Sequence, residues 1–173
     1  MKESLREDIY KTYPEMFTQS KEISCGDGWY SLIKTTCDTI KYVCNLNACK
    51  PPVFAQIKQK FGRLVMYVKY HNAPFGKKNI DVYDIISDAT DSSCKICEEC
   101  GSDNDVITRS SGWLTPLCRE CRSEKTKDNI YDLFVSNLIT SGEIAEANRI
   151  TTRTKRYVKA IIDAIVDELE EVL

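Results

Sequence analysis

The 173-residue chain has little histidine and no long apolar segment, and each shortage excludes a class of protein. His71 is the single histidine, so catalytic designs that need two imidazoles are excluded. Charged residues interrupt every hydrophobic run, whereas a membrane-spanning helix needs about 18 consecutive apolar residues. We therefore expect a protein that neither crosses nor binds a membrane.

The amino-terminal segment also lacks the unbroken apolar stretch of a secretory signal, because Glu3, Arg6 and Glu7 fall within it. We therefore expect a cytoplasmic protein in a reducing compartment. In that setting nine cysteines, an odd number, indicate metal ligands and buried thiols rather than a disulfide framework. The 42% of hydrophobic residues is enough for one sizeable core.

Hydrophobic periodicity predicts an α+β fold in which helices pack on a small antiparallel sheet with an inserted four-cysteine zinc ribbon or knuckle. Apolar residues follow a helical spacing over 4–17, where Pro14 interrupts it. A second helix, buried along one face, is expected over 29–44, and Asp27 is its candidate N-cap.

Strands are expected at 53–60 and 64–70, joined by a turn at 61–63. Both faces of the second strand are fairly apolar, so we expect both to be covered. A further helix follows, for which Asn79 is the candidate cap. The residues expected on its inner side are Ile80, Tyr83, Ile86 and Ala89.

The last third of the chain contains two more helical patterns. The first covers 130–139 and ends before Gly142, and the second is an amphipathic helix over 154–173. The second helix is expected to pack either on its own core or against a second copy of the chain or a partner. Its apolar stripe contains Val158, Ile161, Ile162, Ile165, Leu169 and Val172.

Two matched pairs of cysteines form the strongest signal in the chain. Each pair has the spacing CxxC, which lets a tight turn aim both sulfurs at one ion, and Gly101 relieves the backbone after the first pair. The predicted ligands of one structural Zn²⁺ are Cys97, Cys100, Cys118 and Cys121. Four thiolates leave no open coordination position, so we expect no catalytic role for this metal.

A small hairpin is expected between the two pairs, with Ile107 in one strand and 113–115 in the other. Cys94 leaves the register of the first pair open, because Cys94, Cys97 and Cys100 form two overlapping CxxC pairs. We favour the pair that Gly101 follows. The remaining cysteines are expected to be buried in the core: Cys25, Cys37, Cys44 and Cys49.

Four short motifs occur in order along the chain: Gly26-Asp27-Gly28-Trp29-Tyr30, Lys58-Gln59-Lys60-Phe61-Gly62-Arg63-Leu64, Cys97-Glu98-Glu99-Cys100-Gly101 and Gly112-Trp113-Leu114-Thr115-Pro116-Leu117-Cys118-Arg119-Glu120-Cys121. Together, over residues 26–121, they resemble a largely uncharacterised family of small zinc-ribbon proteins of bacteriophages and prophages. The resemblance implies a phage origin and a zinc site at the two cysteine pairs, and it brings no established activity. Cys94 and the segment after residue 123 depart from the family pattern.

The charge is unevenly distributed, although the formal net charge is only −2. Residues 31–80 carry a net charge of +8, whereas 81–130 carry −5. Basic residues interleaved with aromatic ones can bind single strands through phosphate contacts and base stacking. Acidic flanking segments would oppose this unless they fold to the far side. The candidate nucleic-acid-binding residues are Lys58, Lys60, Arg63, Lys69, Lys77 and Lys78.

An acidic stripe is expected on the helix that follows, because its aspartates recur at helical spacing. We interpret it as a solvated face, with a site for a divalent metal or a basic partner as the alternative. The stripe contains Asp81, Asp84, Asp88 and Asp91.

These patterns predict three parts: an α+β core at 1–93, a zinc ribbon at 94–122 and C-terminal helices at 123–173. The leading hypothesis is a non-catalytic, zinc-stabilised phage protein that binds and modulates a host protein in the host cytoplasm. The first alternative is a nucleic-acid-binding regulator that uses the basic stretch 50–78. The second is a small nuclease, which the single histidine opposes, because His71 lies well before the first cysteine pair.

Overall fold

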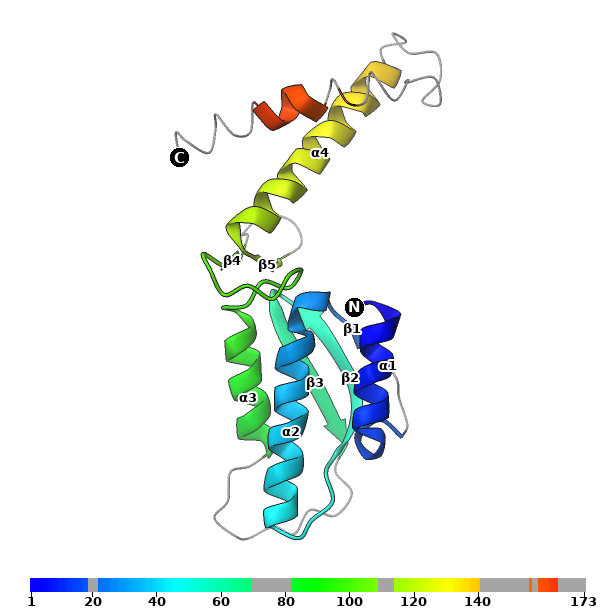
Figure 1. The fold of residues 1–173 in the computed structure, drawn as a ribbon, viewed down its shortest axis with the longest axis vertical. Helices are drawn as coiled ribbons and strands as arrows, with labels where there is room; N and C mark the ends of the chain where they lie inside the picture. Colours follow the sequence, from blue (N-terminus) through cyan, green and yellow to red (C-terminus); the bar gives the residue numbers. More distant parts are fainter. Residues whose placement is uncertain (19–21, 70–81, 109–113, 141–155, 157–158, 165–173) are drawn as a thin grey trace. The chain divides into compact units, whose positions relative to one another are not determined.

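The computed structural model describes residues 1–18, 22–69, 82–108, 114–140, 156 and 159–164 (Figure 1). The chain divides into two compact units, Met1–Arg119 and Glu120–Leu173. Within the described residues no helix is long and apolar enough to cross a membrane. The first unit combines helices with a small sheet, which confirms the predicted α+β class. The division into three parts stays a prediction.

The first two helices begin and end close to the expected positions. Helix α1 covers Glu3–Thr12, and a 3₁₀ turn, η1 (Pro14–Met16), follows it because proline cannot continue an α-helix. A second 3₁₀ turn, η2 (Asp27–Trp29), leads into α2 (Tyr30–Leu46). The prediction that Asp27 caps this helix is wrong. Its carboxylate instead accepts the backbone N–H of Lys2, the residue before α1, at 2.6 Å.

The sheet contains three strands in the order β1-β2-β3. Strands β2 (Val53–Lys60) and β3 (Arg63–Lys69) form the expected antiparallel hairpin, in which Lys60 lies opposite Arg63. Strand β1 (Ile23–Ser24) pairs in parallel with β2. The small sheet is therefore mixed, where an antiparallel one was expected, because a strand of two residues such as β1 is too short to show any periodicity.

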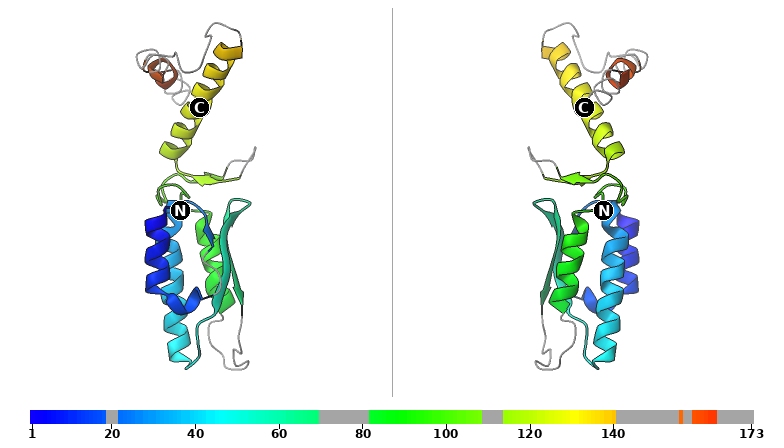
Figure 2. Two further views of the ribbon diagram at one scale, coloured as in Figure 1. Left: turned by 90° about the vertical axis from the view of Figure 1, so that its right-hand side faces the viewer. Right: turned by 90° about the vertical axis from the view of Figure 1, so that its left-hand side faces the viewer.

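Helices α1 and α2, together with α3 (Val82–Ser93), lie on one side of this sheet (Figure 2). The inner face of the sheet packs against them through Phe54, Ile57, Leu64 and Met66, which are at most 5% exposed. On the opposite side Tyr67 is 42% exposed and Val65 is half-buried. The prediction that both faces of β3 are covered is therefore wrong: only the face toward the helices is buried.

Helix α3 buries a different set of residues from the one expected. Ile86 and Ala89 face the core as predicted, but Tyr83 is 55% exposed. Ile85 and Ser93 take the remaining inward positions. The candidate cap Asn79 and its neighbour Ile80 lie outside the described residues.

The second unit contains most of helix α4 (Arg119–Thr140), which begins eleven residues earlier than the predicted 130–139 pattern. The added turns are polar and rich in Arg, Glu and Lys, so they favour a helix by propensity and show no apolar stripe. In the expected helix 154–173, residue 156 and residues 159–164 are helical, with Ile162 buried and Ile161 exposed. The rest of that stripe and Gly142 lie outside the described residues.

Candidate metal centre

The four cysteines of the two CxxC pairs come together in the structure. The sulfurs of Cys97, Cys100, Cys118 and Cys121 all lie within 4.8 Å of one another, and those of Cys100 and Cys118 are 3.6 Å apart. A tetrahedral Zn²⁺ with four thiolates at about 2.3 Å holds neighbouring sulfurs about 3.8 Å apart. The donor set and its spacing therefore fit a single metal ion of this kind.

The first cysteine pair lies on a tight turn of 97–101, which we call the first knuckle. The backbone N–H of Gly101 donates to the carbonyl of Cys97 at 2.9 Å, and the N–H of Cys97 donates to Ser102 at 2.8 Å. Gly101 adopts a φ of +82°, as expected where the backbone curls after the second ligand. These local bonds close the turn on which both sulfurs are presented.

The second pair follows a short ladder that ties it to the first knuckle. Strand β4 (Ile107–Thr108) pairs with β5 (Pro116–Leu117), and Cys118 comes directly after β5. The carbonyl of Pro116 also accepts the N–H of Glu98 at 2.9 Å. The prediction that Leu114 and Thr115 belong to the second strand is therefore wrong, and residue 113 lies outside the described residues. The strand lies closer to Cys118, where its carbonyl can bind the first knuckle.

The first knuckle sits against the loop that leads into α2. The N–H of Gly28 donates to the carbonyl of Glu98 at 2.8 Å, and the N–H of Gly26 donates to the carboxylate of Glu98 at 2.9 Å. The indole N–H of the fully buried Trp29 donates to the carbonyl of Ile96 at 3.0 Å. The GDGW motif was recognised in the sequence, but its contact with the first knuckle was not predicted.

Gly28 shows how close this contact is. A Cβ built on it would lie 2.1 Å from the carbonyl oxygen of Cys97 and 2.4 Å from the backbone nitrogen of Gly101. Both neighbours are backbone atoms, which cannot move aside without opening the knuckle. Only glycine therefore lets the two segments approach this closely.

The thiol of Cys97 is buried, and burial by itself acts to raise its pKa. Hydrogen bonds from the backbone N–H groups of Cys118, Cys100 and Glu99 act in the opposite direction, and the pKa of Cys97 falls to about 7. The thiolate is the form that binds metal, so these N–H groups prepare the sulfur as a ligand.

Cys94 stands apart from the four-sulfur cluster. It follows directly after α3, and its sulfur lies 3.7 Å from the carbonyl of Thr90 on that helix. Of the two overlapping pairs in the sequence, the structure therefore brings Cys97 and Cys100 to the second pair.

The cysteines outside the cluster behave largely as expected. Cys25, Cys37 and Cys44 are buried, whereas Cys49 is only half-buried. Burial raises the pKa of each of the three buried thiols to about 12, so they stay protonated and unreactive at neutral pH.

The other candidate residues are placed only in part. Lys58 is half-buried, and Lys60, Arg63 and Lys69 are exposed. Of the acidic stripe, Asp84, Asp88 and Asp91 are exposed on α3, as a solvated face requires. His71, Lys77, Lys78 and Asp81 lie outside the described residues.

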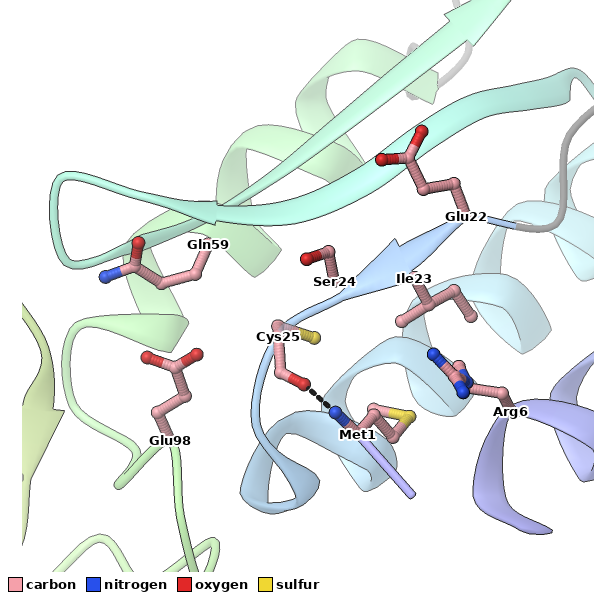
Figure 3. A pocket seen from close by; sticks show the side chains of 8 residues that line it. All are labelled: Met1, Arg6, Glu22, Ile23, Ser24, Cys25, Gln59 and Glu98. Carbon is pink, nitrogen blue, oxygen red and sulfur yellow. Dashed lines mark hydrogen bonds between the residues drawn. The ribbon is translucent and has the colours of Figure 1, made fainter. Parts of the chain in front are cut away.

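A pocket of about 530 Å³ lies beside the first knuckle, between the amino-terminal residues, β1 and β2 (Figure 3). Two of its charged groups are engaged by the protein itself: Arg6 by Glu3 and the carboxylate of Glu98 by Gly26. In the part of the chain that the structure describes, Gln59 Oε1 is the one buried side-chain oxygen without a hydrogen-bond partner. The bond between Glu98 and Gly26 at this pocket helps to hold the first knuckle in place.

Fold and site together define an α+β protein with a four-cysteine cluster that could hold a metal ion. Comparison of the chain with protein-family models, with curated proteins and with solved structures finds no match in any of the three. The resemblance to a phage zinc-ribbon family therefore stays a prediction, and function must be argued from the geometry.

Proposed function

We propose that this chain is a non-enzymatic binding protein whose four-cysteine cluster holds one structural Zn²⁺. The observation that carries the proposal is the approach of four sulfurs to within 4.8 Å of one another. All four are protein ligands, so a tetrahedral ion bound by them has no open position for water or substrate. In the described residues this is the one such group of three or more metal-binding side chains.

The hydrogen bonds around the cluster support a structural role for the metal. The first knuckle receives bonds from the loop before α2 and gives one to β5, so the ion would lock together segments far apart in the chain. Such an ion contributes its binding free energy to folding. We therefore infer that zinc stabilises the first unit and takes no part in a reaction.

Elemental analysis of the purified native protein tests this proposal. We expect one zinc per chain and no iron, and the protein should show no visible absorption of the kind that an iron–thiolate centre produces. Removal of the metal by a chelator should unfold the knuckle segment. Native protein without bound metal, or with iron at the four thiolates, would refute the zinc assignment.

The non-enzymatic part of the proposal has a separate test. Incubation of DNA or RNA with the zinc-loaded protein and Mg²⁺ should leave both substrates intact, because the metal has no free coordination position. Cleavage that a Cys97→Ser variant abolishes would contradict it. The hypotheses of a phage origin and of a host protein as partner stay predictions.

A further inference from the structure

The side of the sheet that faces away from the helices is exposed and basic. We call this side the outer face. Its residues alternate with the buried ones along β3 and, apart from an irregularity between Phe54 and Gln56, along β2. The register sets Lys58 opposite Val65 and Gln56 opposite Tyr67. Tyr67 is 42% exposed, and the ammonium group of Lys58 lies 5.5 Å from the centre of its ring. The basic residues of the outer face are Lys58, Lys60, Arg63 and Lys69.

Two of these cations face each other directly. Lys60 and Arg63 are the paired residues that close the hairpin, and both are exposed. Like charges opposite each other in an antiparallel pair destabilise the sheet. Arg63 also lies 3.5 Å from the exposed Asp91, a contact that solvent and salt weaken. An anion bound between the two cations would relieve their repulsion.

The hairpin turn presents an aromatic ring at a strained position. Phe61 and Gly62 form the two-residue turn with φ values of +53° and +75°. This left-handed conformation favours glycine, asparagine or aspartate at both positions and disfavours a bulky side chain. Phe61 is nevertheless 73% exposed, so its ring gains little from packing. The ammonium group of Lys60 lies 5.3 Å from the centre of this ring, and a strained, exposed ring beside a cation points to a role in binding.

Helix α3 lies in the helical layer, although its Asp91 reaches Arg63 of the outer face. Asp84 and Asp88 are exposed on this helix, and Figure 2 shows α3 with α1 and α2 on one side of the sheet. In the first unit the acidic segment of α3 therefore opposes a polyanion at Arg63, and the strand residues of the outer face itself include no acid. The outer face forms a positive surface although the net charge of the chain is −2.

We propose that the outer face binds single-stranded nucleic acid, with bases stacked on Tyr67 and Phe61 and with phosphates held by Lys58, Lys60, Arg63 and Lys69. The proposal rests on the proposed function, a non-enzymatic binding protein, and names the class of its partner. Exposed rings favour unpaired bases over a duplex, whose bases are already stacked. An acidic polypeptide could use the cations but would supply no bases to stack on the two rings.

Fluorescence anisotropy of a labelled oligothymidylate of about 16 nucleotides tests this proposal on the full-length, zinc-loaded chain. Tyr67→Thr and Phe61→Asn should each lower the affinity about tenfold, because each removes one stacking platform. Lys60→Gln and Arg63→Gln should each reduce the slope of log affinity against log salt by about 0.7, the contribution of one phosphate contact on a single strand.

Matched controls come from the helical layer. Tyr42→Gln removes a tyrosine that is 64% exposed on α2, and Lys11→Gln removes an exposed cation on α1, so neither change should alter binding. Phe61→Asn is informative in a second way. Asparagine tolerates the left-handed conformation, so this variant should be at least as stable as the parent while it binds more weakly. Loss of binding then cannot result from misfolding.

Three results would overturn the proposal: no binding of the oligonucleotide by folded protein at low salt, equal losses in the helical-layer controls, or equal displacement by a DNA duplex or poly-glutamate. Displacement by poly-glutamate would identify an acidic protein as the partner. Zinc measured in the same sample keeps the two proposals separate. Zinc-loaded protein that binds no oligonucleotide refutes only the outer face, whereas metal-free folded protein that binds it refutes only the zinc centre.

Discussion

The core side of α2 and the first knuckle each contain a buried cysteine, and the pKa of the thiol shifts in opposite directions in the two regions. Cys37 and Cys97 are both fully buried. On α2, burial raises the pKa of Cys37 to about 12. In the knuckle, burial also acts to raise the pKa of Cys97, but backbone N–H groups lower it to about 7. Burial alone therefore does not determine the pKa of a cysteine. The hydrogen-bond donors near the sulfur determine the direction of the shift.

Replacement of a thiol in the first knuckle should have the largest effect on metal binding and stability. Cys97→Ser is expected to remove bound zinc and to lower the free energy of unfolding by more than about 4 kcal/mol, because loss of a structural metal is among the most damaging changes. Zinc analysis and urea unfolding measure both effects. Cys94→Ser is the control and should keep its zinc, and equal damage in the two variants would mean that Cys94 is a ligand.

Substitution of Gly28, which packs against the first knuckle, should have the next largest effect. Gly28→Ala places a methyl group 2.1 Å from the carbonyl oxygen of Cys97 in the present geometry. We expect a loss of about 2–3 kcal/mol of stability together with weaker zinc binding, since the knuckle must move. Competition with a zinc chelator reports the affinity. Ser31→Ala, on the exposed first turn of α2, should change stability by less than about 0.5 kcal/mol.

Replacement of a core thiol should lower stability through lost packing and should not change zinc binding. Cys37→Ala leaves a small cavity on the buried side of α2 and is expected to cost about 1–2 kcal/mol. Its zinc content should remain at one per chain, and this separates it from Cys97→Ser. If the Cys37→Ala protein lost its metal, packing at the core thiols would be coupled to zinc binding at the first knuckle.

The last expected effect is absent at neutral pH and is a pH dependence that originates in the core. The pKa of Cys37 rises from 9.0 to about 12 on folding, so above about pH 9 the unfolded chain releases a proton that the folded chain keeps. Stability from this group is complete below pH 9 and is lost as the pH rises toward 12, by at most about 1.4 kcal/mol per pH unit. Denaturant unfolding at pH 9 and pH 10.5 should show a shallower loss for Cys37→Ala than for the parent. An identical slope would contradict the assignment.

The sequence predicted those features whose signals are local. The hairpin of β2 and β3 lies within one residue of its expected limits, because alternation and the Phe61-Gly62 turn are both short-range patterns. The buried side of α2 follows from the spacing of Trp29, Ile33 and Cys37. The close approach of the four sulfurs likewise follows the CxxC spacing, since two intervening residues shape each knuckle.

Other features depend on contacts that leave no pattern in the sequence. Strand β1 is too short to be recognised and exists because β2 lies beside it. Tyr83 was expected to face the core, but the contacts of α3 with α2 and β3 turn Ile85 inward instead. The two glycines around an aspartate in the GDGW motif were a signal of the close approach of the first knuckle. From the sequence they were interpreted as the start of a helix.

Sequence alone determined which side chains can bind a metal and which segments alternate or repeat with a helical period, because both depend on residues close together in the chain. Tertiary structure alone decided that the first knuckle docks on Gly26 and Gly28, that Tyr67 of the outer face is exposed, and that α3 lies on the other side of the sheet. The physical reason is the same in each case. A hydrogen bond between backbone groups some seventy residues apart, such as that between Gly28 and Glu98, requires only glycine and proximity, and proximity is a property of the folded chain.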